Sequence, residues 1–394
     1  MLFSIALIFI VGFLCSRIFQ LIHLPSLMGM ILTGILLGPF VLDLIDPSIL
    51  TMSPDLRQIA LIVILIRAGL TLNLKDLKKV GRPALLMCFV PATIEWFVIT
   101  LAAPLVFSIS YTEAAIMGAV LAAVSPAVVV PRMISLIEEK RGTNKSIPQL
   151  ILAGASVDDI YVIVLFTSFM GIEQGGTFNA WTLAAIPMSI LIGVIVGLLT
   201  GLVLVRLFKK VHMRDTVKVL LILSVSFLLV ALETVLKPIF PMSGLLAVMA
   251  LGATLLKQYS VLATRITGKF SKIWVGAEMV LFVLVGAEVN IHYVTEVGIS
   301  AVLLIVVALG FRMMGVFISL LRTPLNAKER LFCAIAYTPK ATVQAAIGSL
   351  PLAAGVGAGG IILAVAVLSI LISAPFGAIG MDTTKSRLLT RTGT

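Results

Sequence analysis

Apolar residues occur along the chain in runs of about 20, the length of helix needed to cross about 30 Å of hydrocarbon. Short polar segments separate these runs. We interpret the first run as a true membrane span and not a removed signal peptide, because no basic segment precedes it and no small-residue cleavage site follows it. The pattern predicts thirteen transmembrane helices, at approximately 1–20, 24–42, 56–73, 84–108, 112–136, 148–170, 180–208, 216–236, 243–257, 272–290, 296–321, 329–350 and 357–380.

The composition supports this interpretation. The 394 residues are 60% hydrophobic and 12% charged, and the mean hydropathy is +1.17. A soluble domain could not bury that much apolar surface. We therefore expect an all-α polytopic membrane protein that forms a single membrane domain over 1–394. The sequence contains no long linker, low-complexity tail, nucleophile constellation or enzyme signature.

The basic residues indicate the topology, because cytoplasmic loops collect Lys and Arg. Loops after odd-numbered spans contain 24 of them, whereas loops after even-numbered spans contain only Arg57 and Lys237. We expect the N-terminus outside and the C-terminus in the cytoplasm, with the protein integral to a bacterial inner membrane. The same bias accounts for the net charge of +11, so a nucleic-acid partner is not needed to explain it.

A few charged residues remain inside the predicted spans or near their ends. Ionisable groups at membrane depth are costly and typical of transport pathways. The basic ones are Arg67, Arg312 and Lys340, and the acidic ones are Glu95, Asp158, Asp159, Glu233, Glu278 and Glu288.

Asp158 and Asp159 are adjacent in the run from Ile151 to Gly171, which otherwise carries no formal charge. Two neighbouring carboxylates at membrane depth predict a proton or cation site. The alternative is a structural hydrogen bond or an interhelix contact, although one such bond would not require two carboxylates in the same turn.

The chain also contains an internal repeat. Gly69 and Gly286 close the third and tenth spans in the similar segments GLTLNL and GAEVNI, and charged residues, Glu95 and Arg312, follow each glycine after 26 residues. Segments containing Pro126 and Pro339 follow after 57 and 53 residues. Spans three to six thus match spans ten to thirteen. The offset of seven spans reverses the direction of crossing, which predicts the inverted-topology repeats of secondary transporters.

Prolines interrupt the equivalent fifth and twelfth spans, Pro126 and Pro131 in one and Pro339 in the other. Proline removes a backbone donor from a helix, and interrupted membrane helices are tolerated where they line a cavity or pack in protein. If both helices break at mid-depth, their ends present partial charges and free carbonyls beside the aspartates. For either helix alone, a simple proline kink is the alternative.

These segments resemble the monovalent cation:proton antiporter superfamily, and most closely its NHA branch of sodium/hydrogen exchanger 9B-like Na⁺/H⁺ antiporters. The resemblance implies an NhaA/NapA-like fold of about 13 transmembrane helices with two broken crossing helices. It also implies a homodimer with a scaffold at 1–80 and 211–292, an ion-transporting core at 81–172 and 293–382, and a linker helix at 173–210. The matching segments are HLPSLMGMILTGILLGP (23–39), LIRAGLTLNLKDLKK (65–79), AVSPAVVVP (123–131), GASVDDI (154–160), LVGAEVN (284–290) and YTPKATVQAAIGS (337–349).

The resemblance implies exchange of Na⁺ or Li⁺ for H⁺ by alternating access, with no cofactor. It assigns Asp159 as the main cation ligand and proton acceptor and Asp158 as its titrating neighbour. Ser125 and Thr338 become additional ligands. A small cation needs several oxygen ligands and ionised carboxylates, so cation and proton compete for the same oxygens.

Arg312 stands where better-known electrogenic relatives carry a lysine. Arginine effectively cannot lose its proton, so we expect that Arg312 carries no exchanged proton. Glu95 occupies the equivalent position of the repeat, so we expect an ion pair between Glu95 and Arg312, which the resemblance also implies. A purely structural role in burying the arginine is the alternative. We expect Lys340 to offset helix-end charge at the crossing, and Arg67 and Glu288 to line the ion cavity. Plain interhelix pairing is the alternative for these three residues.

Other functions also fit a bundle of this kind. A K⁺/H⁺ antiporter would differ only in the cation. A Na⁺-coupled solute symporter would take up an organic anion, and a cation channel would pass voltage-dependent currents that do not saturate at low turnover.

Overall fold

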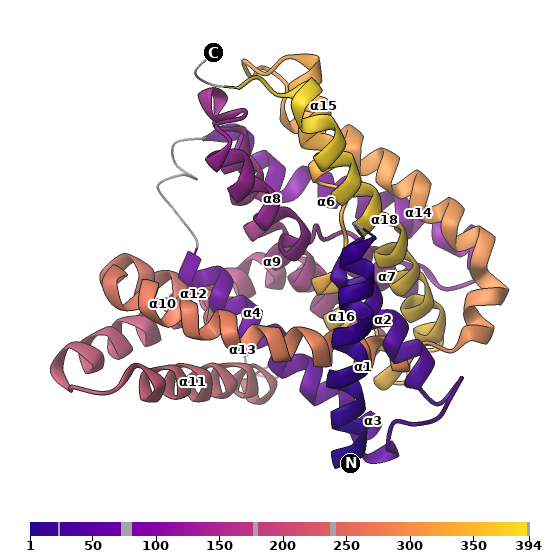
Figure 1. The fold of residues 1–394 in the computed structure, drawn as a ribbon, viewed down its shortest axis with the longest axis horizontal. Helices are drawn as coiled ribbons and strands as arrows, with labels where there is room; N and C mark the ends of the chain where they lie inside the picture. The colour runs from indigo at the N-terminus through magenta and orange to yellow at the C-terminus, as the bar shows by residue number, and fades with distance from the viewer. Residues whose placement is uncertain (23, 72–80, 176–179, 237–241, 392–394) are drawn as a thin grey trace. The chain divides into compact units, whose positions relative to one another are not determined.

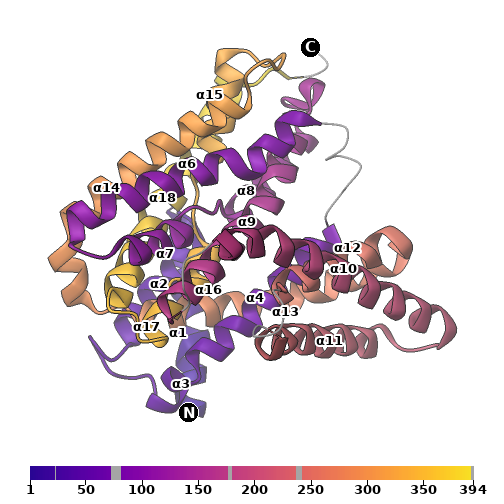
Figure 2. The same ribbon diagram turned by 180° about the vertical axis from the view of Figure 1, so that it is seen from behind.

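A computed structural model describes residues 1–22, 24–71, 81–175, 180–236 and 242–391, and the regular secondary structure of this part of the chain is helical (Figures 1 and 2). Its helices are α1 (Leu2–Leu21), α2 (Ser26–Leu37), α3 (Pro47–Thr51), α4 (Ser53–Thr71), α6 (Arg82–Phe107), α7 (Tyr111–Leu121), α8 (Pro126–Glu138), the 3₁₀ helix η1 (Thr143–Lys145), α9 (Ile147–Glu173), α10 (Ala180–Lys210), α11 (Asp215–Leu236), α12 (Gly244–Gln258), α13 (Ser260–Ala287), α14 (Ile291–Ser319), α15 (Ala327–Ala336), α16 (Thr342–Ile347), α17 (Leu350–Ala353) and α18 (Gly359–Leu388).

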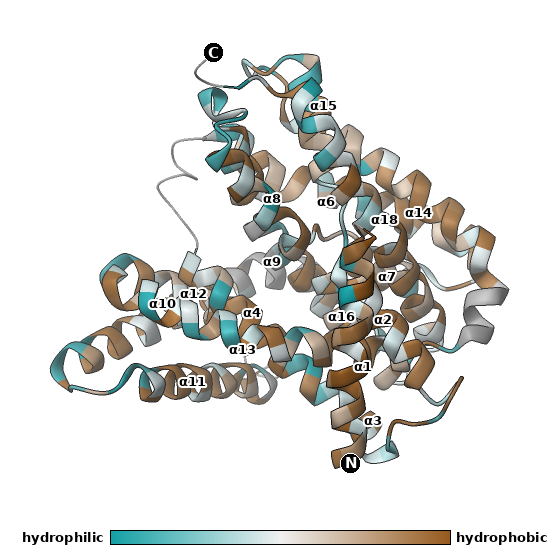
Figure 3. Ribbon diagram, in the orientation of Figure 1, coloured by the Kyte–Doolittle hydropathy of each residue, from teal (hydrophilic) through white to brown (hydrophobic). Residues whose placement is uncertain are grey.

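The prediction of an all-α polytopic membrane protein is confirmed. Each predicted range overlaps a helix or an interrupted pair of helices. Hydrophobic residues cover most of helices such as α11 and α14, and hydrophilic residues gather at helix ends and in loops (Figure 3). Eight helical segments in the described ranges are long and apolar enough to cross a membrane, namely Leu2–Leu21, Arg82–Phe107, Tyr111–Glu138, Leu191–Lys210, Asp215–Glu233, Ser260–Ala287, Val297–Ser319 and Gly359–Leu388. Shorter apolar helices lie between them.

The chain forms two compact units. The first contains residues 1–54, 73–174 and 281–394, and the second contains residues 55–72 and 175–280. In the first unit, α6 packs along α14 and also contacts α7 and α9, while α18 packs against α14 and α15. In the second unit, α12 packs against both α10 and α11. The candidate site described below lies entirely within the first unit.

The glycines that mark the sequence repeat are positions of close helix packing. In the second unit, a Cβ atom on Gly69 would overlap the carbonyl oxygen of Met249. In the first unit, a Cβ atom on Gly286 would overlap the carbonyl oxygen of Ile31. Small residues let membrane helices approach backbone to backbone. Close helix packing in each unit therefore explains why glycine occupies both positions.

Two placements inferred from hydropathy are wrong. The loop expected between the ninth and tenth spans is helical, because α12 ends at Gln258 and α13 begins at Ser260, so Arg265 lies on a helix. Arg57, assigned to a loop, lies within α4 and is fully buried. In both cases helical structure continues past the apolar run, and hydropathy alone does not distinguish a polar helical turn from a loop. The topology also places Lys75, Lys78, Lys79 and Lys237 in loops, and these four residues lie outside the described ranges.

Within the described residues of the first unit, two pairs of consecutive helices are separated by short non-helical breaks. The first break separates α7 from α8 at residues 122–125, and the second separates α15 from α16 at residues 337–341. Pro126 opens α8, a position where its missing N–H has no helical partner to lose. The Ser125 N–H donates to the Pro339 carbonyl over 2.7 Å, so the two breaks are in direct contact. Pro131 lies inside α8.

Candidate ion-binding site

Asp158 and Asp159 lie on α9 and have different surroundings. Asp158 is fully buried, and its Oδ2 accepts hydrogen bonds from the Val124 N–H and from Arg312 Nη2, each over 2.8 Å. Asp159 is 8% exposed, and its buried Oδ1 accepts no hydrogen bond from the described residues. Successive helix residues point about 100° apart, which explains how neighbours on one helix meet different partners.

Arg312 is the centre of a buried polar cluster. Its guanidinium is fully buried and lies 2.8 Å from Glu95 Oε2 on α6 and 2.8 Å from Asp158 Oδ2 on α9. Nε donates to the Tyr337 carbonyl over 2.6 Å, and Nη1 donates to the Ala122 carbonyl. The planar fork of an arginine provides donors in several directions at once. One side chain thus joins α6, α9 and both helix breaks.

Lys340 completes this cluster from the second break. It is 1% exposed, its ammonium lies 2.7 Å from Glu95 Oε1, and it also donates to the Leu121 carbonyl. Formal charges within the cluster balance, with Arg312 and Lys340 opposite Glu95 and Asp158. Asp159 is the additional carboxylate beside a neutral cluster. Lys340 also lies at the carbonyl end of α7, where the helix carries partial negative charge.

Three consecutive backbone carbonyls at the first break each accept a hydrogen bond from a buried side chain. Carbonyls at Leu121 and Ala122 accept from Lys340 and Arg312, and the Ala123 carbonyl accepts from Gln344 Nε2 over 2.9 Å. Buried backbone polar groups require partners of this kind away from water. Gln344 is therefore part of the site, although the sequence motifs do not include it among the candidate residues. The signal available in the sequence was an amide side chain in the otherwise apolar run after Thr342.

The expected hydroxyl ligands lie at the breaks. Ser125 is fully buried, and its Oγ lies 3.5 Å from Thr342 Oγ1. Thr338 Oγ1 donates to the Ile335 carbonyl over 2.8 Å, which leaves its lone pairs available. In the described part of the chain neither hydroxyl bonds directly to an aspartate. No group of three or more His, Cys, Asp or Glu side chains among the described residues forms a metal cluster.

Tyr337 supports Arg312 from the second break and was not selected from the sequence. Its carbonyl accepts from Arg312, and its ring centroid lies 5.6 Å from the guanidinium carbon. Its hydroxyl lies so close to Gly154 on α9 that a Cβ atom there would overlap it. The tyrosine therefore fills the space between Arg312 and the helix that carries the aspartates.

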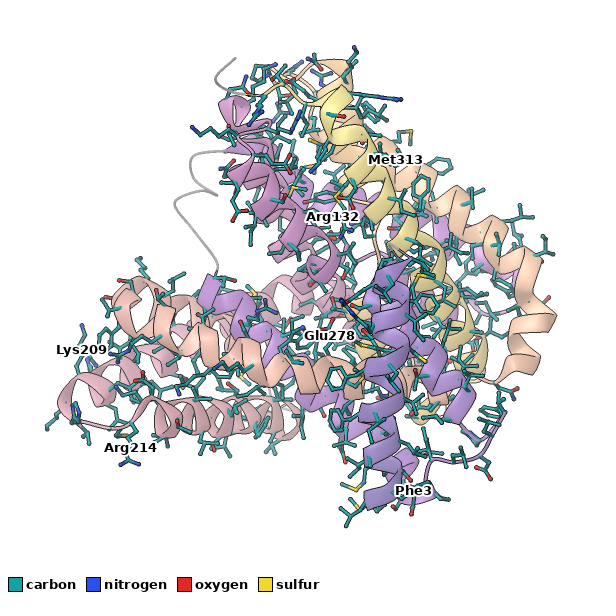
Figure 4. The ribbon with its side chains drawn as sticks, viewed as in Figure 1. Phe3, Arg132, Lys209, Arg214, Glu278 and Met313 are labelled. Carbon is teal, nitrogen blue, oxygen red and sulfur yellow. The ribbon has the colours of Figure 1, made fainter. Side chains whose placement is uncertain are left out.

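Two expected cavity residues lie in different units. Arg67 is half-buried on α4 in the second unit, and Glu288 is half-buried just after α13 in the first. Glu278, which Figure 4 labels, is a half-buried residue of α13 in the second unit. The roles of Arg67 and Glu288 stay predictions.

Further ion pairs join helices of the first unit outside the buried cluster. Arg132, labelled in Figure 4, lies 3.0 Å from Asp382 and connects α8 to α18. The Lys385 ammonium lies 2.5 Å from Glu139, and this hydrogen bond holds the pKa of the Glu139 carboxyl below its ordinary value. A further pair, Lys145 with the buried Glu329 over 2.8 Å, links η1, which precedes α9, to α15. These pairs therefore connect α8 to α18 and η1 to α15 in addition to the contacts of the buried cluster.

Comparisons with known proteins agree with this architecture. The family described as "Sodium/hydrogen exchanger, transmembrane" matches residues 5–382. Human sodium/hydrogen exchanger 9B2 is 33% identical over 413 residues, which cover 98% of this chain and 75% of that protein. Human sodium/hydrogen exchanger 9B1 is also 33% identical, with 99% of this chain and 78% of that protein covered.

The fold is similar to that of a solved transporter. The structure of the sodium proton antiporter MjNhaP1 from Methanocaldococcus jannaschii at pH 8 aligns with a TM-score of 0.86 at 21% identity, covering 98% of this chain and 97% of that one. The family predicted from the sequence motifs is confirmed. The chain therefore belongs to the transmembrane sodium/hydrogen exchanger family, and it is a membrane transporter and not an enzyme.

Proposed function

We propose that this transporter exchanges Na⁺ or Li⁺ for H⁺ by alternating access, and that cation and proton compete for Asp159. The observation that carries the proposal is the difference between the two aspartates. Oδ1 of each aspartate is buried with no hydrogen-bond partner among the described residues, but Asp158 is in addition held at Oδ2 by two donors, one of them the guanidinium of Arg312. A buried polar oxygen without a partner is costly, and a proton or a cation would satisfy it.

The neighbouring groups supply what a small cation requires. Na⁺ and Li⁺ bind hard oxygen ligands, and the carboxylates must be ionised to take part. Asp158 Oδ1 is also buried without a hydrogen bond, and the hydroxyls of Ser125 and Thr338 lie at the breaks. We assign these oxygens as secondary ligands in the cation-loaded state. Protonation of Asp159 would neutralise the site and release the cation.

The charged cluster has a supporting role in this proposal. Arg312 stays protonated at all relevant pH values, so it does not carry the exchanged proton. Instead it holds Asp158 in place and fixes both breaks through the carbonyls of Ala122 and Tyr337. Lys340 neutralises Glu95 and the end of α7. Asp159 is thus the group of this site that is left to bind either ion.

The wider architecture also belongs to the proposal. We infer thirteen crossings, inverted repeats, a mobile core that moves like an elevator against a dimerising scaffold, and a C-terminus in the cytoplasm. The repeat is supported by Glu95 and Arg312, which occupy equivalent sequence positions and lie 2.8 Å apart. It is also supported by the contact between the equivalent breaks at Ser125 and Pro339. Residues related by an internal two-fold axis meet in this way when they lie near the axis.

Purified protein in proteoliposomes provides the test. With a pH dye inside the vesicles, additions of Na⁺ and Li⁺ are expected to drive proton movement, and K⁺ is expected to drive little or none. The signal should persist when a potassium ionophore clamps the membrane potential. Proton movement driven by K⁺ but not by Na⁺ or Li⁺ would mean that K⁺ is the exchanged cation. Unsaturating, voltage-driven Na⁺ current without proton movement would indicate a channel, and Na⁺-dependent uptake of an organic anion would indicate a symporter.

A further inference from the structure

A cavity of about 280 Å³ lies between α8, α15 and α18 in the first unit. Part of its wall is apolar and is formed by the buried side chains of Leu136, Phe332 and Met381. The volume is close to the lower limit for small-molecule sites, which range from about 300 to 1,000 Å³. The cavity therefore fits a small ligand, or one end of a larger ligand, with an apolar group against this wall.

Charged side chains line the same cavity. Arg132 and Lys385 are its basic residues, Asp382 is its acidic residue, and Ser135 adds a hydroxyl. The two basic residues come from different helices, α8 and α18, and their side chains are 27% and 31% exposed. Basic pockets between membrane helices on the cytoplasmic side are typical sites for phosphate headgroups. Two cations beside an apolar wall therefore favour an anionic ligand with an apolar part.

The guanidinium of Arg132 is oriented for a bidentate contact. Its Nη1 donates to the Val128 carbonyl over 3.0 Å, one turn earlier on α8, which limits the rotation of the side chain. Its Nε and Nη2 both donate to Oδ2 of Asp382, over 3.2 and 3.0 Å. This edge of a guanidinium is the fork that binds two oxygens of a phosphate. Asp382 occupies the fork with one oxygen, whereas a phosphate would offer two.

The two carboxylates near these cations differ in how firmly they are held. Asp382 is 53% exposed, and a partly exposed ion pair contributes little to stability, so its carboxylate can turn towards water. Glu139 accepts from Ser135, Arg141 and Lys385 and is satisfied where it is. The Lys385 ammonium has three donor hydrogens, so it can keep Glu139 and still donate to a phosphate.

We propose that this cavity is a binding site for a phosphate ester that carries an apolar group, the chemistry of an acidic phospholipid. Arg132 and Lys385 bind the phosphate, and the ligand replaces Asp382 on Arg132 and connects α8 to α18. In the topology proposed above, the end of α18 lies at the cytoplasmic leaflet, where anionic lipids are concentrated. Among the described residues, no hydrogen bond or ion pair joins these three side chains to Asp158 or Asp159, so binding is expected to stabilise the protein and leave the exchange rate unchanged.

Thermal unfolding of the purified protein in detergent tests the site, because a ligand that binds the folded state raises the midpoint. Dihexanoyl phosphatidic acid, titrated at low ionic strength, is expected to raise the midpoint in a saturable manner. Dihexanoyl phosphatidylcholine has the same chains and a zwitterionic headgroup, and it should have little effect. Glycerol 3-phosphate has the phosphate without the chains and should bind at least about tenfold more weakly, the scale of burying two methylene groups.

Variants locate the binding. Arg132→Gln should weaken the binding of phosphatidic acid roughly tenfold or more, because it removes the charged fork. Asp382→Asn should tighten it about threefold, because it removes the competing carboxylate. Arg265→Gln is the matched control, since its pair with Asp215 is also partly exposed but lies in the second unit, and it should bind like the wild type. Each midpoint is compared with that of the same variant without lipid, so a change in intrinsic stability does not affect the result.

Opposite effects of Arg132→Gln and Asp382→Asn, with an unchanged control, support the site. Equal stabilisation by phosphatidylcholine, or equal binding of phosphatidic acid by Arg132→Gln and the wild type, would overturn it. Equally tight binding of glycerol 3-phosphate would overturn the apolar part of the assignment and identify a soluble phosphate ester as the ligand. Transport does not enter this measurement, so its result is independent of the proposed exchange function.

Discussion

Asp159→Asn is expected to reduce Na⁺- and Li⁺-driven proton movement by roughly 100-fold or more, the scale at which loss of a proton-transferring group affects a reaction. Asparagine has nearly the same shape but binds no proton in this pH range and brings no negative charge. It would leave the site unable to hold either ion tightly. Initial rates in proteoliposomes, normalised to the amount of inserted protein, measure the loss.

Stability gives this prediction an independent control. Asp159 Oδ1 has no hydrogen-bond partner among the described residues, so Asp159→Asn should leave the thermal midpoint in detergent unchanged or raise it. Asp158→Asn, one residue away, should lower it, because Arg312 would lose a buried anionic partner. Asp382→Asn removes a carboxylate from a partly exposed pair with Arg132 and should keep the transport rate. Wild-type transport in Asp159→Asn would refute the site assignment.

Arg312→Gln is expected to cause the largest loss of stability among single changes in the cluster, about 3–5 kcal/mol, the usual cost of breaking a buried ion pair. The change would leave Glu95 and Asp158 with one cation between them, Lys340, and would remove the donors to the carbonyls of Ala122 and Tyr337. Glu95→Gln should cost less, because Arg312 keeps Asp158 and both carbonyls. Thermal unfolding in detergent ranks the variants.

The double variant Glu95→Gln with Arg312→Gln tests whether the pair acts as a unit. Residues in contact show coupling, so the loss in the double variant should be smaller than the sum of the two single losses. Arg132→Gln is a suitable control, because the ion pair between Arg132 and Asp382 is partly exposed and is expected to contribute little to stability. Simple additivity of the Glu95 and Arg312 effects would mean that the two side chains do not interact in the membrane.

The sequence predicts which residues belong to the site better than it predicts which of them contact one another. Asp158 and Asp159 stand out because charge is rare in apolar runs, and Pro126 and Pro339 mark breaks because proline cannot continue a helix. Both signals depend only on residues that are neighbours along the chain, so they can be recognised in the sequence. Hydropathy also predicts the helices well, since helix length is set by the bilayer.

Connections between distant residues were harder to predict. Arg312 and Glu95 are 217 residues apart, and only their equivalent places in the repeat suggested a contact. Nothing in the local pattern indicates that the same guanidinium also reaches Asp158, or that Lys340 shares Glu95. Gln344 was missed for a similar reason, because its partner is a backbone carbonyl and any residue supplies one. An amide in an apolar run indicates a buried polar contact, but residue type does not show which backbone carbonyl it contacts.

The extents of polar helical segments were also misjudged. Arg265 lies on α13 and Arg57 is buried in α4, although hydropathy placed both in loops. The hydrogen bonds of a helix are independent of the hydropathy of its side chains, so helices continue through charged turns. The apolar pattern therefore does not mark where such helices begin and end.

The dependence of the apparent KM for Na⁺ on pH tests the central claim most directly. If cation and proton compete for Asp159, each tenfold rise in proton concentration in the acidic range should raise the apparent KM about tenfold, and the maximal rate at saturating Na⁺ should stay constant. This measurement needs only wild-type protein in proteoliposomes at several clamped pH values. An apparent KM that is independent of pH, together with a maximal rate that falls in acid, would contradict a shared site and place the two ions on separate groups.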